Sequence, residues 1–195
     1  MTADEALHAL TEGNRRFAGG RPANPRRDPE RRSELVSGQH PFVAVLACSD
    51  SRVVPEILFD QGLGDLFSIR VPGNVVDETV LGSLELGVEH LGVPLVVVLG
   101  HTQCGALTVA LAAEADDDHR QTLVKLLQPA LDASARGDGD PEKRLERAVR
   151  ANVRLAVEEL RRSTPTLGPH HRQGALRIVG AVYDIATGLV DWMEG

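Results

Sequence analysis

Short apolar runs alternate with amphipathic segments along the middle of this 195-residue chain. Three runs have the length and continuous hydrophobicity of strands that are buried on both faces of a parallel sheet. These runs are Val43–Ala47, Leu66–Val71 and Leu95–Leu99. Between the second and third runs, apolar residues recur every three or four positions from about Glu78 to His90, which predicts a helix. This order predicts a βαβ crossover.

The first 38 residues have a different pattern. Thr2 and Glu5 have the spacing of a capping box, which predicts a helix from about Ala3 to Phe17. Gly19 to Pro22 would end that helix, and the proline- and arginine-rich residues that follow predict an extended arm with a short helix over about Glu30–Ser37. Such an arm is expected to pack on a partner subunit.

The second half of the chain predicts two more helices and two more strands. We expect a helix from Gly105 to about Glu114, then a solvated loop over the polar residues 116–120. Asp140 and Pro141 supply an N-cap and a first-turn proline for a long helix with one apolar face. The residues 168–171 interrupt this pattern and are read as a loop. The expected strands are Leu176–Tyr183 and, after a turn, an antiparallel strand Leu189–Trp192.

Together these elements predict one α/β domain that spans residues 1–195. Its centre is a mainly parallel sheet of four to five strands, with one antiparallel edge strand and flanking helices. Length and a hydrophobic content of 42% are sufficient for one substantial core. The arm of residues 1–38 is the only part expected to leave this core.

Net charge and the lack of long apolar runs limit the partners. The formal charge is −7 and the pI is about 5.5, so the chain lacks the cationic face that binding a nucleic acid requires. No apolar run approaches the roughly 20 residues of a membrane span, and the first twenty residues show no signal-peptide core. We therefore expect a cytoplasmic protein that binds neither nucleic acid nor membrane.

Both cysteines of the chain lie just after predicted strands, together with a histidine and a carboxylate. Cys48 and Asp50 follow the first strand, and His101 and Cys104 follow the third. The carboxyl ends of neighbouring parallel strands meet at one edge of a sheet, so these side chains can surround one ion. Two thiolates and an imidazole with a free fourth position are a ligand set of catalytic zinc. The alternative is that each cysteine is an ordinary buried hydrophobe.

The two segments are similar to the signatures Cys-x-Asp-x-Arg and His-x-x-Cys of the β-class carbonic anhydrases. The similarity extends to residues 10–17, 39–41, 70–74 and 182–188. The resemblance implies that Cys48, His101 and Cys104 bind one zinc ion per subunit. It also implies reversible hydration of CO2 to bicarbonate and a proton by zinc-bound hydroxide, in a homodimer or a higher homo-oligomer with its active site at the subunit interface.

The resemblance also assigns roles near the zinc. Arg52 would hold Asp50, which would accept a hydrogen bond from the hydroxide or, in a closed state, become the fourth zinc ligand. Gln39 would donate to bicarbonate and Phe67 would line the CO2 pocket across the interface. Gly105 could present its backbone N–H to a bound anion at a helix N-terminus.

Some positions depart from the family pattern. Val45 stands where the bicarbonate-regulated subclass has tryptophan, so we expect no such regulation. Leu86 replaces a common tyrosine and Pro72 a common alanine, which affects the shape of the pocket rather than the zinc site. Histidine is the side chain most often used to relay protons, so the adjacent His170 and His171 are candidates for a proton relay.

Three alternatives remain open. The same zinc site could hydrolyse carbonyl sulfide or carbon disulfide, since these substrates differ from CO2 mainly in shape. The chain could instead be a non-catalytic zinc protein that binds bicarbonate. A thiol redox protein is the third alternative, although Cys48 and Cys104 do not form a Cys-x-x-Cys motif.

Overall fold

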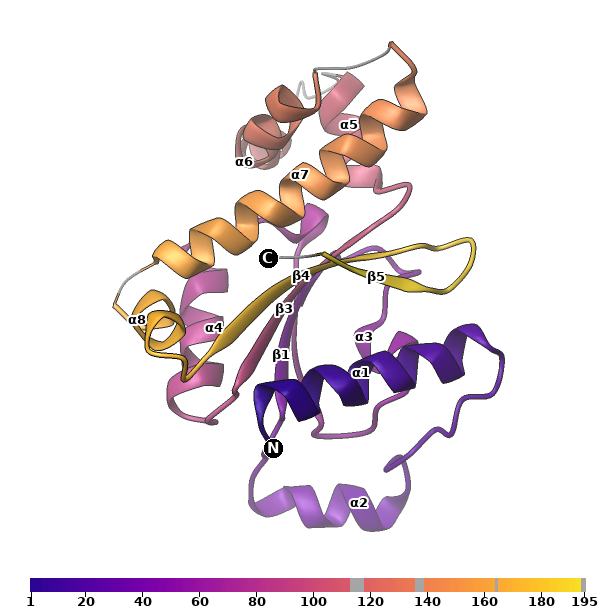
Figure 1. The fold of residues 1–195 in the computed structure, drawn as a ribbon, viewed down its shortest axis with the longest axis vertical. Helices are drawn as coiled ribbons and strands as arrows, with labels where there is room; N and C mark the ends of the chain where they lie inside the picture. Colours follow the sequence, from indigo (N-terminus) through magenta and orange to yellow (C-terminus); the bar gives the residue numbers. More distant parts are fainter. Residues whose placement is uncertain (113–117, 136–138, 164, 194–195) are drawn as a thin grey trace.

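Five strands form one sheet in the computed structural model, which describes residues 1–112, 118–135, 139–163 and 165–193 (Figure 1). The strand order is β2-β1-β3-β4-β5, with parallel pairing throughout except for β5, which pairs antiparallel with β4. The strands are β1 Val43–Ala47, β2 Leu66–Arg70, β3 Leu95–His101, β4 Arg177–Tyr183 and β5 Val190–Met193. The predicted sheet is therefore confirmed, including its antiparallel edge.

The helices are distributed along the whole chain. They are α1 Ala3–Ala18, α2 Pro29–Glu34, η1 Leu35–Ser37, α3 Pro55–Leu58, η2 Pro72–Asn74, α4 Glu78–Glu89, α5 Gly105–Ala112, α6 Asp118–Ser134, α7 Pro141–Arg162 and α8 Leu167–Arg172. None of these described helices is long and apolar enough to cross a membrane.

The two central strands are buried along their full length because helices cover both faces of the sheet. Every residue of β1 and of β3 is buried. Successive residues of β1 point to opposite faces, so Ala44 and Leu46 join a core with α4, α5, α6 and α7, whereas Val43 and Val45 join a core with α1 and α3. Figure 1 shows α4 and α7 on one side of the sheet and α1 on the other.

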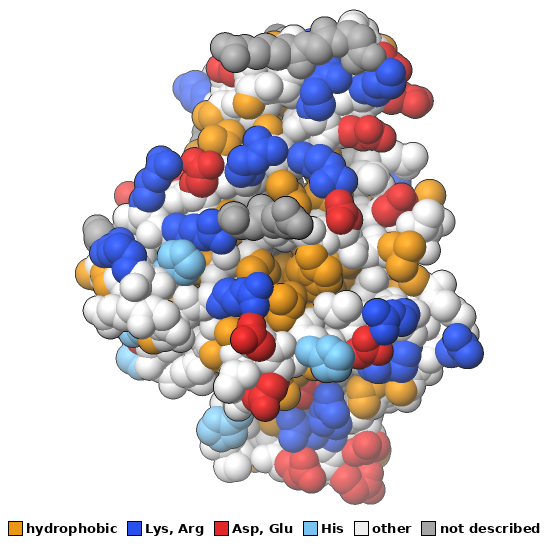
Figure 2. Space-filling view, in the orientation of Figure 1, with side chains coloured by type: hydrophobic (Ala, Val, Ile, Leu, Met, Phe, Trp, Pro, Cys, Tyr) orange, Lys and Arg blue, Asp and Glu red, His pale blue; other side chains and the backbone are white. Residues whose placement is uncertain are grey.

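Edge strand β5 leaves part of the sheet uncovered. A groove of about 580 Å³ opens there, with Val179, Trp192 and Met193 as apolar lining and Arg161 and Arg177 as basic lining. In the space-filling view, apolar side chains gather near the middle of the face, with both basic and acidic side chains around them (Figure 2).

Three helical segments differ from the sequence predictions. The loop expected over 116–120 is wrong from Asp118 onward, because α6 begins there. Its apolar residues Leu123, Leu127 and Leu131 recur every four positions and face the core, and this burial stabilises the helix despite its internal Pro129. The loop expected at 168–171 is also wrong, since α8 spans it, and the short α3 was not predicted. The end of the helix expected near Glu114 lies outside the described residues.

The N-terminal helix packs on its own chain. The capping box of Thr2 and Glu5 is present, and Ala6 and Leu10 are fully buried. Asn14 donates from Nδ2 to the carbonyl oxygens of Leu58 and Gly188, at 3.1 and 2.9 Å. By contrast, α2 buries no residue at all. That residues 1–38 contact a partner subunit stays a prediction, and it now concerns α2 and η1 more than α1.

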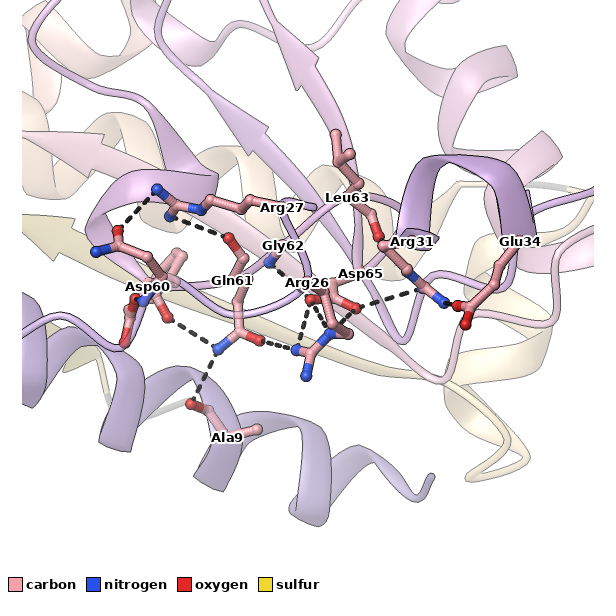
Figure 3. Close-up of polar contacts among 12 residues, drawn as sticks. Ala9, Arg26, Arg27, Arg31, Glu34, Asp60, Gln61, Gly62, Leu63 and Asp65 are labelled. Atoms are coloured by element: carbon pink, nitrogen blue, oxygen red, sulfur yellow. Dashed lines mark hydrogen bonds and ion pairs between the residues drawn. The ribbon is translucent and has the colours of Figure 1, made fainter. Parts of the chain in front are cut away.

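Two buried carboxylates anchor the extended segment between α1 and α2. Asp60 is fully buried and accepts hydrogen bonds from Arg16 Nε at 2.7 Å and from the backbone N–H groups of Ala23 and Asn24, both at 2.8 Å. Asp65 accepts hydrogen bonds from Nε and Nη2 of Arg26 (Figure 3). The arm is therefore attached to the loop that precedes β2.

Candidate metal centre

The central strands β1 and β3 bring the predicted ligands together. These strands are neighbours, and Ala47 at the end of β1 pairs with Leu99. Cys48 is the next residue after β1, and His101 is the last residue of β3. Cys104 follows a tight turn in which Gln103 has a φ of 55°, and α5 begins at Gly105. The sheet topology thus places three ligand residues at one edge.

Cys48, His101 and Cys104 form a compact and buried group. One ligand atom from each residue lies within 4.8 Å of the other two. The exposed fractions are 4% for Cys48, 0% for His101 and 1% for Cys104. Both cysteines are free thiols. A group of this size and composition could hold a metal ion.

The imidazole of His101 is oriented for metal binding. Its Nδ1 lies 2.9 Å from the carbonyl oxygen of Thr102, so Nδ1 carries the proton and Nε2 has a free lone pair. Nε2 is buried and has no hydrogen-bond partner among the described residues. A buried nitrogen without a partner is unfavourable in a folded protein, and a metal ion would satisfy it. The donor set therefore fits zinc.

Hydrogen bonds make the two thiols unequal. Cys104 donates to Cys48, which lowers the pKa of Cys48 and raises the pKa of Cys104. Hydrogen bonds from the backbone N–H groups of Asp50 and Gly73 lower the pKa of Cys48 further, whereas its burial opposes them. The pocket is thus arranged to stabilise a thiolate at Cys48, which is the form that binds metals.

Asp50 lies beside this group and is held by Arg52. Arg52 donates from Nε to Oδ1 at 2.9 Å and from Nη2 to Oδ2 at 2.7 Å, and its backbone N–H donates to Oδ1 at 2.9 Å. These bonds hold the pKa of Asp50 well below its usual range, so the group is an ionised acceptor. Its Oδ2 is 4.0 Å from His101 Nε2.

Hydrogen bonds from outside the ligand group fix the backbone around the site, and two of the residues involved lie in the segment 70–74 that the family resemblance includes. Arg70 donates to the carbonyl oxygens of Cys48 and Asp50, at 3.1 and 2.6 Å. The backbone N–H of Gly73 donates to Cys48 Sγ at 3.2 Å. On the far side of Gly73, Asn152 donates to its carbonyl oxygen. In the sequence, Asn152 could have been noticed as a polar residue on the apolar face of the long helix.

A mainly apolar pocket of about 350 Å³ opens onto the group. Its lining includes Cys48, Asp50 and Gly105 together with Val109 and Leu123 from α5 and α6. Gly105 is exposed and is the first residue of α5, as the sequence predicted. The pocket gives a small neutral molecule access to the region beside Cys48 and Asp50.

Gln39 and Phe67 do not reach the metal centre of their own chain. Gln39 precedes β1, is exposed, and lines a separate hollow with Leu35 and Leu63. Phe67 pairs with Ala44 near the start of edge strand β2 and is half-buried against Gly87 of α4. Both residues are therefore at the wrong end of the strands to act within one chain.

The candidates for a proton relay, His170 and His171, lie far from the metal centre of their own chain. Both residues lie in α8, which precedes the amino end of β4, whereas His101 pairs with Tyr183 at its carboxyl end. The six residues that separate these ends along the strand span about 20 Å. Their Nδ1 atoms lie 2.9 and 3.1 Å from the carbonyl oxygens of Thr166 and Leu176, so both imidazoles stabilise α8 and the turn that follows.

The sequence matches a known family over most of its length. Residues 43–190 match the model of the carbonic anhydrase family. The chain is 40% identical over 187 residues to carbonic anhydrase 2 of Mycobacterium tuberculosis, covering 94% of this chain and 89% of that protein. It is 38% identical over 190 residues to the carbonic anhydrase of Mycolicibacterium smegmatis, covering 95% and 91% of the two chains. The chain belongs to the carbonic anhydrase family.

Solved structures place it in the β class of that family. The β-carbonic anhydrase of Coccomyxa in complex with acetazolamide has a TM-score of 0.78 and 29% identity, covering 96% of this chain and 86% of that one. A tetrameric β-carbonic anhydrase of Sordaria macrospora has a TM-score of 0.77 and 25% identity, covering 98% of both chains. The predicted resemblance and the predicted fold are both confirmed.

Proposed function

We propose that this protein catalyses the reversible hydration of CO2 to bicarbonate and a proton, with one zinc ion held by Cys48, His101 and Cys104. The unpartnered Nε2 of His101, buried beside two thiols, is the observation that carries this proposal. Bound zinc would supply a water of lowered pKa and hence a nucleophile near neutral pH. Membership of the carbonic anhydrase family supports the same reaction.

Asp50 and Arg52 are proposed to orient that nucleophile. Because Arg52 engages both carboxylate oxygens of Asp50, the carboxylate is ionised and can only accept a hydrogen bond. An acceptor at this place selects the direction of the water's O–H and leaves an oxygen lone pair for the substrate carbon. The pairing of Asp50 with Arg52 supports an open state, in which Asp50 would not be a metal ligand.

The surrounding residues are proposed to bind substrate and product. The apolar lining of the 350 Å³ pocket suits CO2, which is neutral and weakly hydrated. The exposed N-terminus of α5 at Gly105 would donate a backbone N–H to bicarbonate. No group of these described residues distinguishes CO2 from carbonyl sulfide, so turnover of the two substrates must be compared directly.

A second copy of the chain is proposed to complete the site. Gln39 and Phe67 can act on substrate only if a neighbouring subunit supplies them, because each lies away from the metal ligands of its own chain. The exposed α2 and the open groove at β5 offer surfaces for such contacts. We propose a homodimer or a higher homo-oligomer. Its location would be the cytoplasm, where the two thiols stay reduced.

The proposal is tested by stopped-flow CO2 hydration with the purified protein, at pH 8.5 and with its zinc content measured. A rate well above buffer in a protein with one zinc ion per chain supports it. Zinc at this ratio without hydration would identify a non-catalytic bicarbonate-binding protein, and faster turnover of carbonyl sulfide would identify a hydrolase. A protein without zinc would exclude the proposed chemistry.

A further inference from the structure

Asn152 is a buried polar residue on the apolar face of α7. It is 7% exposed, and its neighbours Val149, Val153 and Ala156 on the same helix are buried as well. Its Nδ2 donates to the carbonyl oxygen of Gly73 at 2.7 Å. The N–H of the same glycine donates to Cys48 Sγ at 3.2 Å. One side chain from a distant helix is thus connected to a metal ligand through a single residue.

Gly73 needs such an external support because its backbone is unusual. Its φ is 66°, and that of Asn74 is 42°, so two successive residues adopt the left-handed conformation. Glycine enters this region freely but also leaves it freely, since it has no Cβ to restrict rotation. A larger residue would be strained at this φ, and its Cβ would lie 3.2 Å from Leu127 Cδ2 and 3.3 Å from Ala106 Cβ, so these neighbours would have to shift.

Two hydrogen bonds fix the conformation of this turn. Asn74 N donates to Val71 O at 3.0 Å, which closes the turn on one side. Asn152 holds the Gly73 carbonyl on the other side, in a place that is closed to solvent. Without the amide of Asn152, only the Asn74 N–H bond holds the peptide that follows Gly73. Rotation about the backbone of Gly73 is then less restricted, and the Gly73 N–H loses its fixed direction toward Cys48 Sγ.

We propose that Asn152 is a positioning residue for the metal centre. Through Gly73 it keeps an N–H donor on the sulfur of Cys48, and this donor strengthens metal retention and limits the electron donation of the thiolate. This inference rests on the proposed function, because it requires that Cys48 binds a metal ion. Asn152 itself does not touch the ligand group.

The expected effect follows from the behaviour of groups that support metal ligands. Loss of such a group lowers metal affinity or activity by about 10- to 100-fold. In addition, a thiolate that loses an N–H donor is a stronger electron donor to the metal. Its charge-transfer absorption in a cobalt-substituted site then moves to longer wavelength, which a change in overall stability does not produce.

The test compares three purified variants of the full chain. Asn152→Leu keeps the branched shape and the number of side-chain heavy atoms without the donor, and Asn152→Ala removes the donor without overpacking. Val157→Ala is the control, since Val157 is also buried on α7 but contacts Gly180 of β4 and not Gly73. Zinc release to an excess of chelator and the thiolate-to-cobalt absorption of the Co²⁺ form are measured for each variant at 25 °C.

We expect zinc release to be about 10- to 100-fold faster in both Asn152 variants, with a charge-transfer band at longer wavelength. Val157→Ala should match the wild type in both readouts despite a lower melting temperature. Wild-type release rates and spectra in the folded Asn152 variants would overturn the inference. So would a failure of both Asn152 variants to fold while Val157→Ala folds, because Asn152 would then serve the fold.

The same experiment separates this inference from the proposed function. A wild-type protein that binds neither zinc nor cobalt refutes the proposed function, and the role of Asn152 with it. A wild-type protein that holds one zinc ion, together with unchanged Asn152 variants, refutes the positioning role alone.

Discussion

Replacing Asp60 with alanine should loosen the N-terminal arm and lower the stability of the whole domain. Asp60 is fully buried and accepts three hydrogen bonds, from Arg16 and from the backbone of Ala23 and Asn24. Removing one partner of a buried ion pair costs about 3–5 kcal/mol. Arg16 is 40% exposed and regains water when the arm detaches, so we expect the low end of this range, about 3 kcal/mol.

This loss corresponds to a clear change in melting temperature. For a chain of 150–250 residues, each kcal/mol shifts the melting temperature by about 2–4 °C, so Asp60→Ala should melt roughly 6–12 °C lower. Asp191→Ala is a matched control, because Asp191 is 61% exposed in its ion pair with Arg150. Such a surface pair contributes only about 0–1 kcal/mol. Calorimetry and tryptic cleavage within residues 19–28 report the two effects.

The lowered pKa of Asp60 also determines how its contribution to stability depends on pH. Burial raises the pKa of Asp60, but the hydrogen bonds from Ala23, Arg16 and Asn24 outweigh it, so the pKa in the folded protein is lowered. The stabilisation is therefore complete above the unfolded pKa of about 3.9 and is lost as the pH falls through the lower folded value. Equal melting of Asp60→Ala and Asp191→Ala at pH 7 would refute the reasoning.

Three further predictions concern catalysis. Asp50→Asn should lower kcat for CO2 hydration by about 100-fold while zinc content stays at one per chain, because an amide can also donate and so misdirects the nucleophile; unchanged kcat would exclude the orienting role. The hydration rate of the wild type should rise from about pH 6 to pH 9. Two thiolate ligands cancel the charge of Zn²⁺, so the pKa of a zinc-bound water would be lowered less than by neutral ligands. A flat stopped-flow profile over this range would contradict the prediction. The double variant His170→Ala, His171→Ala should keep the wild-type hydration rate in weak buffer, because a strand length of about 20 Å separates both residues from the ligands of their own chain. A marked loss of rate would show that these histidines do relay protons.

The sheet could be predicted because its strands carry a strong local signal. β1 and β3 are continuous apolar runs, and burial on both faces requires this composition. The strand order could not be obtained from these runs alone, since pairing depends on contacts across the whole chain. Helix α6 was missed because the polarity of a short segment is a weak guide to secondary structure. Its charged first turn was read as a loop, although an apolar repeat follows.

The ligand group could be predicted because each ligand directly follows or ends a buried strand. The position of Gln39 and Phe67 could not, since spacing along the chain does not show which end of a strand faces the site. Asn152 was missed for a different reason. Its partner is a backbone carbonyl 79 residues away in the sequence, and only the folded structure brings the two together.

The most direct test of the account is the metal content of two proteins, the wild type and His101→Ala, measured with their CO2 hydration rates. The account predicts about one zinc ion per wild-type chain with rapid hydration, and the loss of both in His101→Ala, because the orphaned Nε2 supplies one of three ligands. A His101→Ala protein that retains stoichiometric zinc and full activity, or a wild type that hydrates CO2 without any metal, would contradict it.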